Sequence, residues 1–195
     1  ILEFVSQHHY MHVSLLFPFP LYNTSMSKEE MLKQLRDRIE ANQGSRNIYC
    51  FLDFDGVINV PYGDERDFDL EWVFKANTNV MPRFNELCLK YKLKLIISST
   101  WRSLGLDYVK NYLYESGMDE NIKVVGRTGY DEHFDRGNEI LTYLSKHPRI
   151  TRFIILDDAP LPELEQWHIH TRFLEGLTEE KKAEAERMLD KYEKV

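Results

Sequence analysis

Residues 48–59 read IYCFLDFDGVIN, an apolar run that ends in two carboxylates and turns at a glycine. The run lacks any alternation of apolar and polar residues, which is typical of a strand covered on both faces in a parallel sheet. Asp53 and Asp55 lie two positions apart, so in extended backbone their side chains point the same way while Phe54 points into the core. The two carboxylates can therefore address one atom of a ligand, and we expect the rest of the chain to bring further polar groups to them.

The composition fits one globular domain with an extension. The chain has 195 residues, and 43% of them are hydrophobic, which is enough to bury a substantial core. Cys50 and Cys88 stand in apolar patterns without the spacing of a metal or redox site, so we expect a cytoplasmic protein. The formal net charge of -7 gives no general attraction to polyphosphates, so a nucleic acid would need a local basic patch.

Residues 1–25 are interpreted as an extension, which could be a leader, a segment added by cloning or a docking arm. Its apolar run at 15–22 contains Pro18 and Pro20, follows no Lys or Arg, and is far shorter than the roughly 20 residues that a membrane helix needs. We therefore expect no membrane contact. The domain proper is expected over 26–195, opening with an amphipathic helix at 27–43 that Ser27 and Glu30 cap.

The pattern after the first strand alternates between helices and strands. Residues 60–78 form an acidic loop with three aromatic residues, interpreted as a flap. Helices are then expected from Pro82, over 106–116, over 136–146 and from Thr178, and strands over 93–97, 122–125, 153–156 and 168–171, the last at an edge. This order predicts an α/β fold, a Rossmann-like doubly wound parallel sheet with right-handed crossovers.

Polar side chains follow three of the predicted strands, at the edge where such sheets bind ligands. Each of them alone could be a turn residue or a helix cap, but together they indicate a site. They are Asp53 and Asp55, Ser98 and Ser99, and Asp157 and Asp158. Four acidic groups meeting at one edge would repel each other without a cation, and oxygen ligands with room for water suit Mg²⁺. A calcium loop would instead lie between helices and carry a late Glu.

Four ordered motifs resemble those of phosphatases of the haloacid dehalogenase (HAD) superfamily. They are FLDFDGV at 51–57, the strand-end Ser98, Arg136 at the start of a helix, and Asp157-Asp158. The similarity is closest to the compact branch that includes the HAD domain of RNA-repair proteins, which SSTWR at 98–102, GRT at 126–128, RGNEI at 136–140 and GLT at 176–178 resemble. It runs from about residue 47 to the C-terminus, and the intervals between the motifs leave no separate cap domain.

The resemblance implies a role for each acidic residue. Asp53 matches the nucleophile that forms an aspartyl-phosphate, and Asp55 matches the acid/base that protonates the leaving oxygen and then activates water. Asp53, the backbone carbonyl of Asp55, and Asp158 would hold Mg²⁺, with Asp157 assisting.

The resemblance also implies phosphate ligands. Ser98 would donate a hydrogen bond to the phosphoryl group, with Ser99 as the alternative. Arg136 matches a basic position where Lys is more common. Arg102 and Arg127 are rival ligands, either of which could instead form an ion pair with the acidic flap.

The resulting prediction is a Mg²⁺-dependent phosphomonoester hydrolase. An open site favours a bulky substrate, a phosphoprotein or a nucleic-acid end, although the acidic flap would repel a long polyanion. The alternatives are a small-molecule or nucleotide phosphatase, or a non-catalytic HAD-like binding or regulatory module. Trp101, Trp167 and the tyrosines of 108–114 are interpreted as packing residues, and His168 and His170 receive no role.

Overall fold

The structure of the protein is a computed structural model that describes residues 26–42, 44–60, 76–131 and 133–193. The N-terminal extension and most of the predicted flap therefore lie outside the described residues. Five strands form one sheet in the order β3-β2-β1-β4-β5, and all paired neighbours are parallel. The strands are β1 (Tyr49–Leu52), β2 (Lys94–Ile97), β3 (Lys123–Arg127), β4 (Phe153–Asp157) and β5 (His168–His170).

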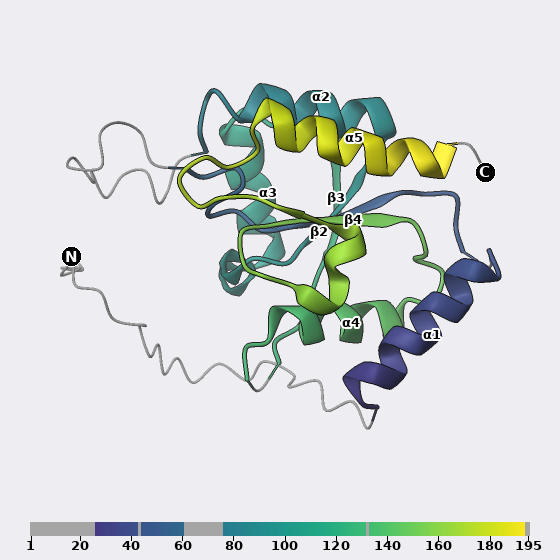
Figure 1. Ribbon diagram of the computed structural model, residues 1–195. Helices are drawn as coiled ribbons and strands as arrows, with labels where there is room; N and C mark the ends of the chain where they lie inside the picture. The colour runs from purple at the N-terminus through teal and green to yellow at the C-terminus, as the bar shows by residue number, and fades with distance from the viewer. Residues whose placement is uncertain (1–25, 43, 61–75, 132, 194–195) are drawn as a thin grey trace.

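Helices cover both faces of this sheet. One face carries α2 (Met81–Tyr91), α3 (Leu106–Glu115) and α5 (Glu179–Glu193), and the other carries α1 (Lys28–Glu40) and α4 (Arg136–Lys146) (Figure 1). β1 alternates between the two cores, because Cys50 and Leu52 pack on the first face and Phe51 on the second. The predicted doubly wound α/β fold is therefore confirmed, and the described residues contain no separate cap domain.

Several boundaries differ from the predicted ones. The apolar run that begins at residue 48 was predicted to be a strand, and that strand ends at Leu52. The chain turns after Phe54, whose carbonyl accepts hydrogen bonds from three following amides. The first helix ends at Glu40, and Asn42 has a φ of 49°, a left-handed conformation that does not continue a helix. Two short 3-10 helices, η2 (Thr100–Leu104) and η3 (Pro162–Trp167), were not predicted.

Helix α1 is fixed to the start of α4 by a partly exposed cluster of charges. The ammonium of Lys28 lies 2.8 Å from a carboxylate oxygen of Asp135 and 2.6 Å from one of Glu163. Burial opposes the charge of Lys28, but its hydrogen bonds to both carboxylates raise its pKa overall. Burial raises the pKa of Asp135, but the hydrogen bond and charge of Lys28, together with backbone hydrogen bonds at the start of α4, outweigh burial and leave that pKa below its usual value. Asp135 also caps α4, so this cluster helps to set where that helix begins.

Candidate active site

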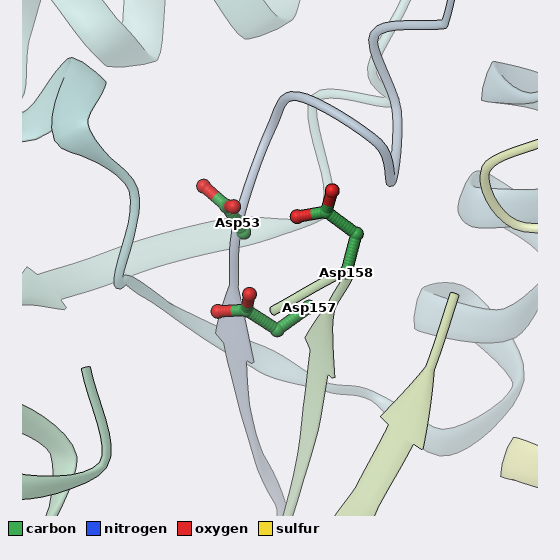
Figure 2. Close-up of side chains that lie close together, drawn as sticks. All are labelled: Asp53, Asp157 and Asp158. Carbon is green, nitrogen blue, oxygen red and sulfur yellow. The ribbon is translucent and has the colours of Figure 1, made fainter. Parts of the chain in front are cut away.

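Three carboxylates meet where β1 and β4 end. The two strands pair in parallel with Leu52 opposite Leu156, so the residues that follow, Asp53 and Asp157, emerge at the same level. Asp158 comes next, and one oxygen of each of the three carboxylates lies within 4.8 Å of the others (Figure 2). The register of the central strand pair thus places Asp53 beside Asp157, the last residue of β4, and Asp158, which follows it, as the sequence predicted.

Burial makes this arrangement electrostatically costly. Asp157 is fully buried, and burial together with the nearby Asp53 raises the pKa of Asp157. The same two causes raise the pKa of the half-buried Asp158. Carboxylates gathered at this spacing favour a bound cation, and a set of oxygen donors suits Mg²⁺. The described residues therefore fit the predicted divalent metal.

Gly56 lets the turn after β1 approach Asp158. Its φ is +73°, and a Cβ atom built on it would lie 2.6 Å from Cγ of Asp158. The turn is held from the far end of the chain, because the hydroxyl of Thr171 donates to the carbonyl of Gly56 at 2.7 Å. The amide of Leu177 donates to the carbonyl of Val57 at 2.9 Å. Only a residue without a side chain fits at this position.

Arg136 is the basic residue that the structure brings to the carboxylates. It is the first residue of α4, and its Nη1 lies 2.6 Å from Oδ2 of Asp157 and 3.5 Å from Oδ2 of Asp53. Burial opposes its charge, but the surrounding carboxylates, Asp53 first, raise its pKa overall. Arg136 therefore remains a guanidinium cation beside Asp53, where the sequence predicted a phosphate ligand.

Arg102 is committed to other partners. Its side chain is 2% exposed, and Nη2 lies 2.6 Å from Oε1 of Glu139, a residue that the sequence reasoning gave no role. Nη1 donates to the carbonyls of Ser98 and Ser99 at 3.1 and 2.7 Å. Arg102 thus forms an ion pair with Glu139 of α4, whereas most of the acidic flap, its other predicted partner, lies outside the described residues. Phosphate binding by Arg102 stays a prediction to which these contacts lend no support.

Arg127 donates through Nη1 to the backbone carbonyl of Arg102. The described residues show no ion pair between Arg127 and the carboxylates at the ends of β1 and β4. Its rival role as a phosphate ligand therefore also stays a prediction.

The two serines after β2 have different surroundings. Ser99 is the N-cap of η2, where its hydroxyl accepts from the amide of Trp101 at 3.3 Å. The Oγ of Ser98 is buried and has no hydrogen-bond partner among the described residues. A buried hydroxyl without a partner is costly, so Ser98 is the serine with a donor to offer a ligand.

Asp55 is held apart from the cluster of Asp53, Asp157 and Asp158. Its Oδ1 accepts from Nδ2 of Asn59 and its Oδ2 from Nε1 of Trp101, both at 3.0 Å. The hydroxyl of Tyr112 lies 2.8 Å from Oδ1 of Asn59. Burial raises the pKa of Asp55. Trp101 and Tyr112 do pack in the core as predicted, with ring centroids 4.6 Å apart, but the sequence reasoning missed their polar contacts.

His168 and His170 support the backbone behind the carboxylates. Each ring places Nε2 2.9 Å from a carbonyl oxygen, that of Asp157 for His168 and that of Asp158 for His170. A carbonyl only accepts, so both rings donate from Nε2. Burial lowers the pKa of His168, which keeps that ring neutral. Parallel pairing of β5 with β4 was the signal that could have found these contacts.

Comparison with known families agrees with this geometry. The family model described as "HAD domain in Swiss Army Knife RNA repair proteins" matches residues 49–182, more than half of the chain. The chain belongs to this HAD family. The match begins at the first residue of β1 and reaches into α5, so it includes every strand and all the carboxylates described above. Comparison with curated proteins and with solved structures gives no match.

Membership makes the protein a HAD-type hydrolase, and HAD enzymes generally use Mg²⁺, which the acidic cluster of this HAD domain could bind. Among the described residues, no helix is long and apolar enough to cross a membrane.

Proposed function

We propose that this HAD domain is a Mg²⁺-dependent phosphomonoester hydrolase that works through an aspartyl-phosphate on Asp53. The observation that carries the proposal is the meeting of Asp53, Asp157 and Asp158 beside Arg136 at the ends of β1 and β4. A non-catalytic module would have no chemical need for a nucleophile with an acid/base two residues away.

In the first step, a carboxylate oxygen of Asp53 attacks phosphorus, and the bond from phosphorus to the leaving oxygen breaks. Asp55 gives its proton to that oxygen, so the product leaves as an alcohol. In the second step, Asp55 takes a proton from water, whose oxygen attacks phosphorus and breaks the bond to Asp53. Phosphate leaves, and both carboxyl groups return to their starting states.

The phosphoryl oxygens are held by two other groups in this proposal. The guanidinium of Arg136, 3.5 Å from Asp53, balances charge on the phosphate and on the nucleophile. The unpartnered hydroxyl of Ser98 donates a further hydrogen bond. When bound, Mg²⁺ would be held by Asp53, the carbonyl of Asp55, and Asp158, and would screen the phosphate from the approaching carboxylate.

Asp157 suits an assisting role better than that of nucleophile. Its Oδ2 accepts from Arg136 at 2.6 Å and its Oδ1 accepts from the amide of Ala159 at 2.9 Å. Both oxygens are therefore engaged, and the side chain is fully buried. Asp53 keeps a small exposed surface, 7% for the residue, through which a phosphate can be reached.

We propose the phosphorylated end of an RNA as the substrate. The family's description refers to RNA repair, and the described residues contain no cap domain that would enclose a small molecule. A net charge of -7 favours contact with an end over contact along a polyanion. The two cysteines are free and buried, which agrees with the cytoplasm, where we propose that the protein acts.

The test is phosphate release from RNA oligonucleotides phosphorylated at either end, compared with a phosphopeptide, a nucleotide and an aryl phosphate. We expect turnover with Mg²⁺, loss of turnover with EDTA, and a phosphate adduct on the peptide that contains Asp53 after acid quenching. Asp53→Asn should abolish turnover. Asp119→Asn is the matched control, because Asp119 precedes β3 and so lies near the N-terminal ends of the strands, whereas Asp53 follows the C-terminal end of β1. Undiminished activity in Asp53→Asn would overturn the mechanism, and preference for the phosphopeptide would overturn the substrate class.

A further inference from the structure

The carboxylate of Asp55 is fixed by three neutral side chains whose contacts form one connected network. Asn59 and Trp101 each donate to a different oxygen of Asp55 at 3.0 Å, and the hydroxyl of Tyr112 lies 2.8 Å from Asn59. We call Asn59, Trp101 and Tyr112 the Asp55 clamp. Asn59 is fully buried and Trp101 is 8% exposed, so water competes little for these bonds.

The backbone turn after β1 builds one half of the clamp. The carbonyl of Phe54 accepts from the amides of Val57, Ile58 and Asn59, which brings residue 59 back beside residue 55. The amide of Gly56 donates to the carbonyl of Asn59 at 2.9 Å and closes the turn. Asn59 therefore meets Asp55 through local geometry.

Core packing builds the other half. The ring of Trp101 lies 5.5 Å from that of Phe54 and 4.6 Å from that of Tyr112, measured between centroids. Trp101 comes from η2 after β2, and Tyr112 comes from α3. Three elements thus meet at Asp55, and ring packing limits the positions that the indole can take.

The hydroxyl of Tyr112 decides which way the amide of Asn59 faces. In its ionised form Asp55 only accepts hydrogen bonds, so Asn59 turns its NH₂ group to Asp55 and its oxygen to Tyr112. The hydroxyl can donate to that oxygen, and this satisfies both ends of the amide. Without the hydroxyl, the carbonyl oxygen of a fully buried amide would lose its partner.

We propose that Asn59, Trp101 and Tyr112 are positioning residues that hold the carboxyl group of Asp55 in place for proton transfer in both steps of the reaction. The inference rests on the proposed function, because it assigns these residues to the acid/base of that mechanism. Asp55 must face the leaving oxygen in the first step and a water oxygen at the same place in the second. A carboxyl group held at both oxygens keeps one orientation between the two steps.

The proposal makes the effect of a clamp variant depend on the leaving group. Phenyl phosphate releases a poor leaving group, so its first step needs the proton of Asp55. Dinitrophenyl phosphate releases a stable anion, so its first step proceeds without that proton, but the second step still needs Asp55 to activate water. A defect confined to Asp55 therefore slows both steps for the first substrate and only the second step for the other.

The experiment measures the first turnover and the steady state of both substrates with Mg²⁺. Trp101→Phe keeps a ring in the core and removes the indole N–H, and Tyr112→Phe removes only the hydroxyl. The matched controls are Trp167→Phe, in which the altered ring stacks on Phe153, and Tyr114→Phe, in which the lost hydroxyl donates to the carbonyl of Ile122. Melting temperatures show whether each variant folds.

For both clamp variants we expect turnover of phenyl phosphate to fall about ten- to a hundredfold with little change in KM. With dinitrophenyl phosphate, the rate of the first turnover should equal that of the wild type, while the steady-state rate falls. The phosphate adduct on Asp53 should then accumulate above its wild-type level. Both control variants should retain the wild-type rates with both substrates.

Wild-type rates in the clamp variants, or equal losses of rate in both steps for both substrates, would overturn the proposal that the clamp positions Asp55. Those outcomes leave the wild-type adduct and the inactivity of Asp53→Asn intact, so they are separable from failure of the mechanism. A wild-type enzyme that forms no adduct on Asp53 would overturn both.

Discussion

Replacing Gly56 by alanine tests whether the turn after β1 leaves room for a side chain beside Asp158, the proposed metal ligand. The added Cβ would lie 2.6 Å from Cγ, 2.7 Å from Oδ2 and 2.8 Å from Cβ of Asp158. Side chains do not tolerate such distances, so the carboxylate or the turn has to move. The turn is held by Thr171 and Leu177 through its carbonyls, so we expect the carboxylate to move.

The magnitude has two parts. The left-handed φ of +73° costs an alanine about 1–2 kcal/mol of folding stability. For a domain of this size this corresponds to a melting temperature lower by about 2–8 °C. Displacing a catalytic group by about 1 Å costs on the order of a hundredfold in rate. Gly56→Ala should therefore lose far more activity than stability.

Gly117→Ala separates the two parts. Gly117 also has a positive φ, +95°, but a Cβ there would meet only Cγ of Met81 at 3.8 Å, an ordinary contact. The control should lose similar stability while keeping its activity. The assay is the rise in melting temperature with Mg²⁺ concentration, together with kcat on an aryl phosphate. Gly56→Ala should show a weaker response to Mg²⁺ than Gly117→Ala, and equal responses and equal kcat would refute the reasoning.

Three further variants have expected outcomes. Ser98→Ala should reduce kcat/KM at least tenfold with less than about 1 kcal/mol lost in urea unfolding, because the hydroxyl has no partner to lose; a wild-type rate would contradict this. Glu139→Gln should cost about 3–5 kcal/mol in urea unfolding, because it leaves Arg102 charged and buried, and a loss below about 1 kcal/mol would contradict it. Lys28→Met should cost less than about 1 kcal/mol at neutral pH. The folded-state pKa of Asp135 is lowered, so the difference in the free energy of unfolding between the wild type and Lys28→Met should vanish as the pH falls through that pKa. A difference that persists in acid would contradict the pairing.

The sequence predicted the acidic cluster because its geometry follows from strand direction. Parallel strands end at one edge, so any carboxylates that follow Leu52 and Leu156 must be neighbours once β1 and β4 pair. Arg136 was found differently, because the resemblance to HAD phosphatases places a basic residue at the start of that helix. Apolar runs and capping residues were enough to locate the strands and helices to within a few residues.

The sequence could not reveal partners that only tertiary packing brings together. Arg102 and Glu139 are separated by 37 positions. Nothing in the local sequence shows that the guanidinium of Arg136 faces Asp53 and Asp157 while that of Arg102 is buried against Glu139. Trp101 was predicted to pack, and it does, but its polar N–H can be assigned only when the position of Asp55 is known. Hydrophobic patterns predict burial, and they do not predict which polar atom of a buried side chain is used.

The turn after β1 also sets when the protein can become active during its synthesis. Residues 53–59 include Asp53, the proposed nucleophile. The turn is fixed by Thr171 and Leu177, and the strand before it pairs with β4, about a hundred residues later in the chain. A growing chain therefore carries Asp53 long before it has the neighbours that make this carboxylate reactive. Close to the entire domain must leave the ribosome before the site exists, so we expect incomplete chains to lack the proposed phosphatase activity.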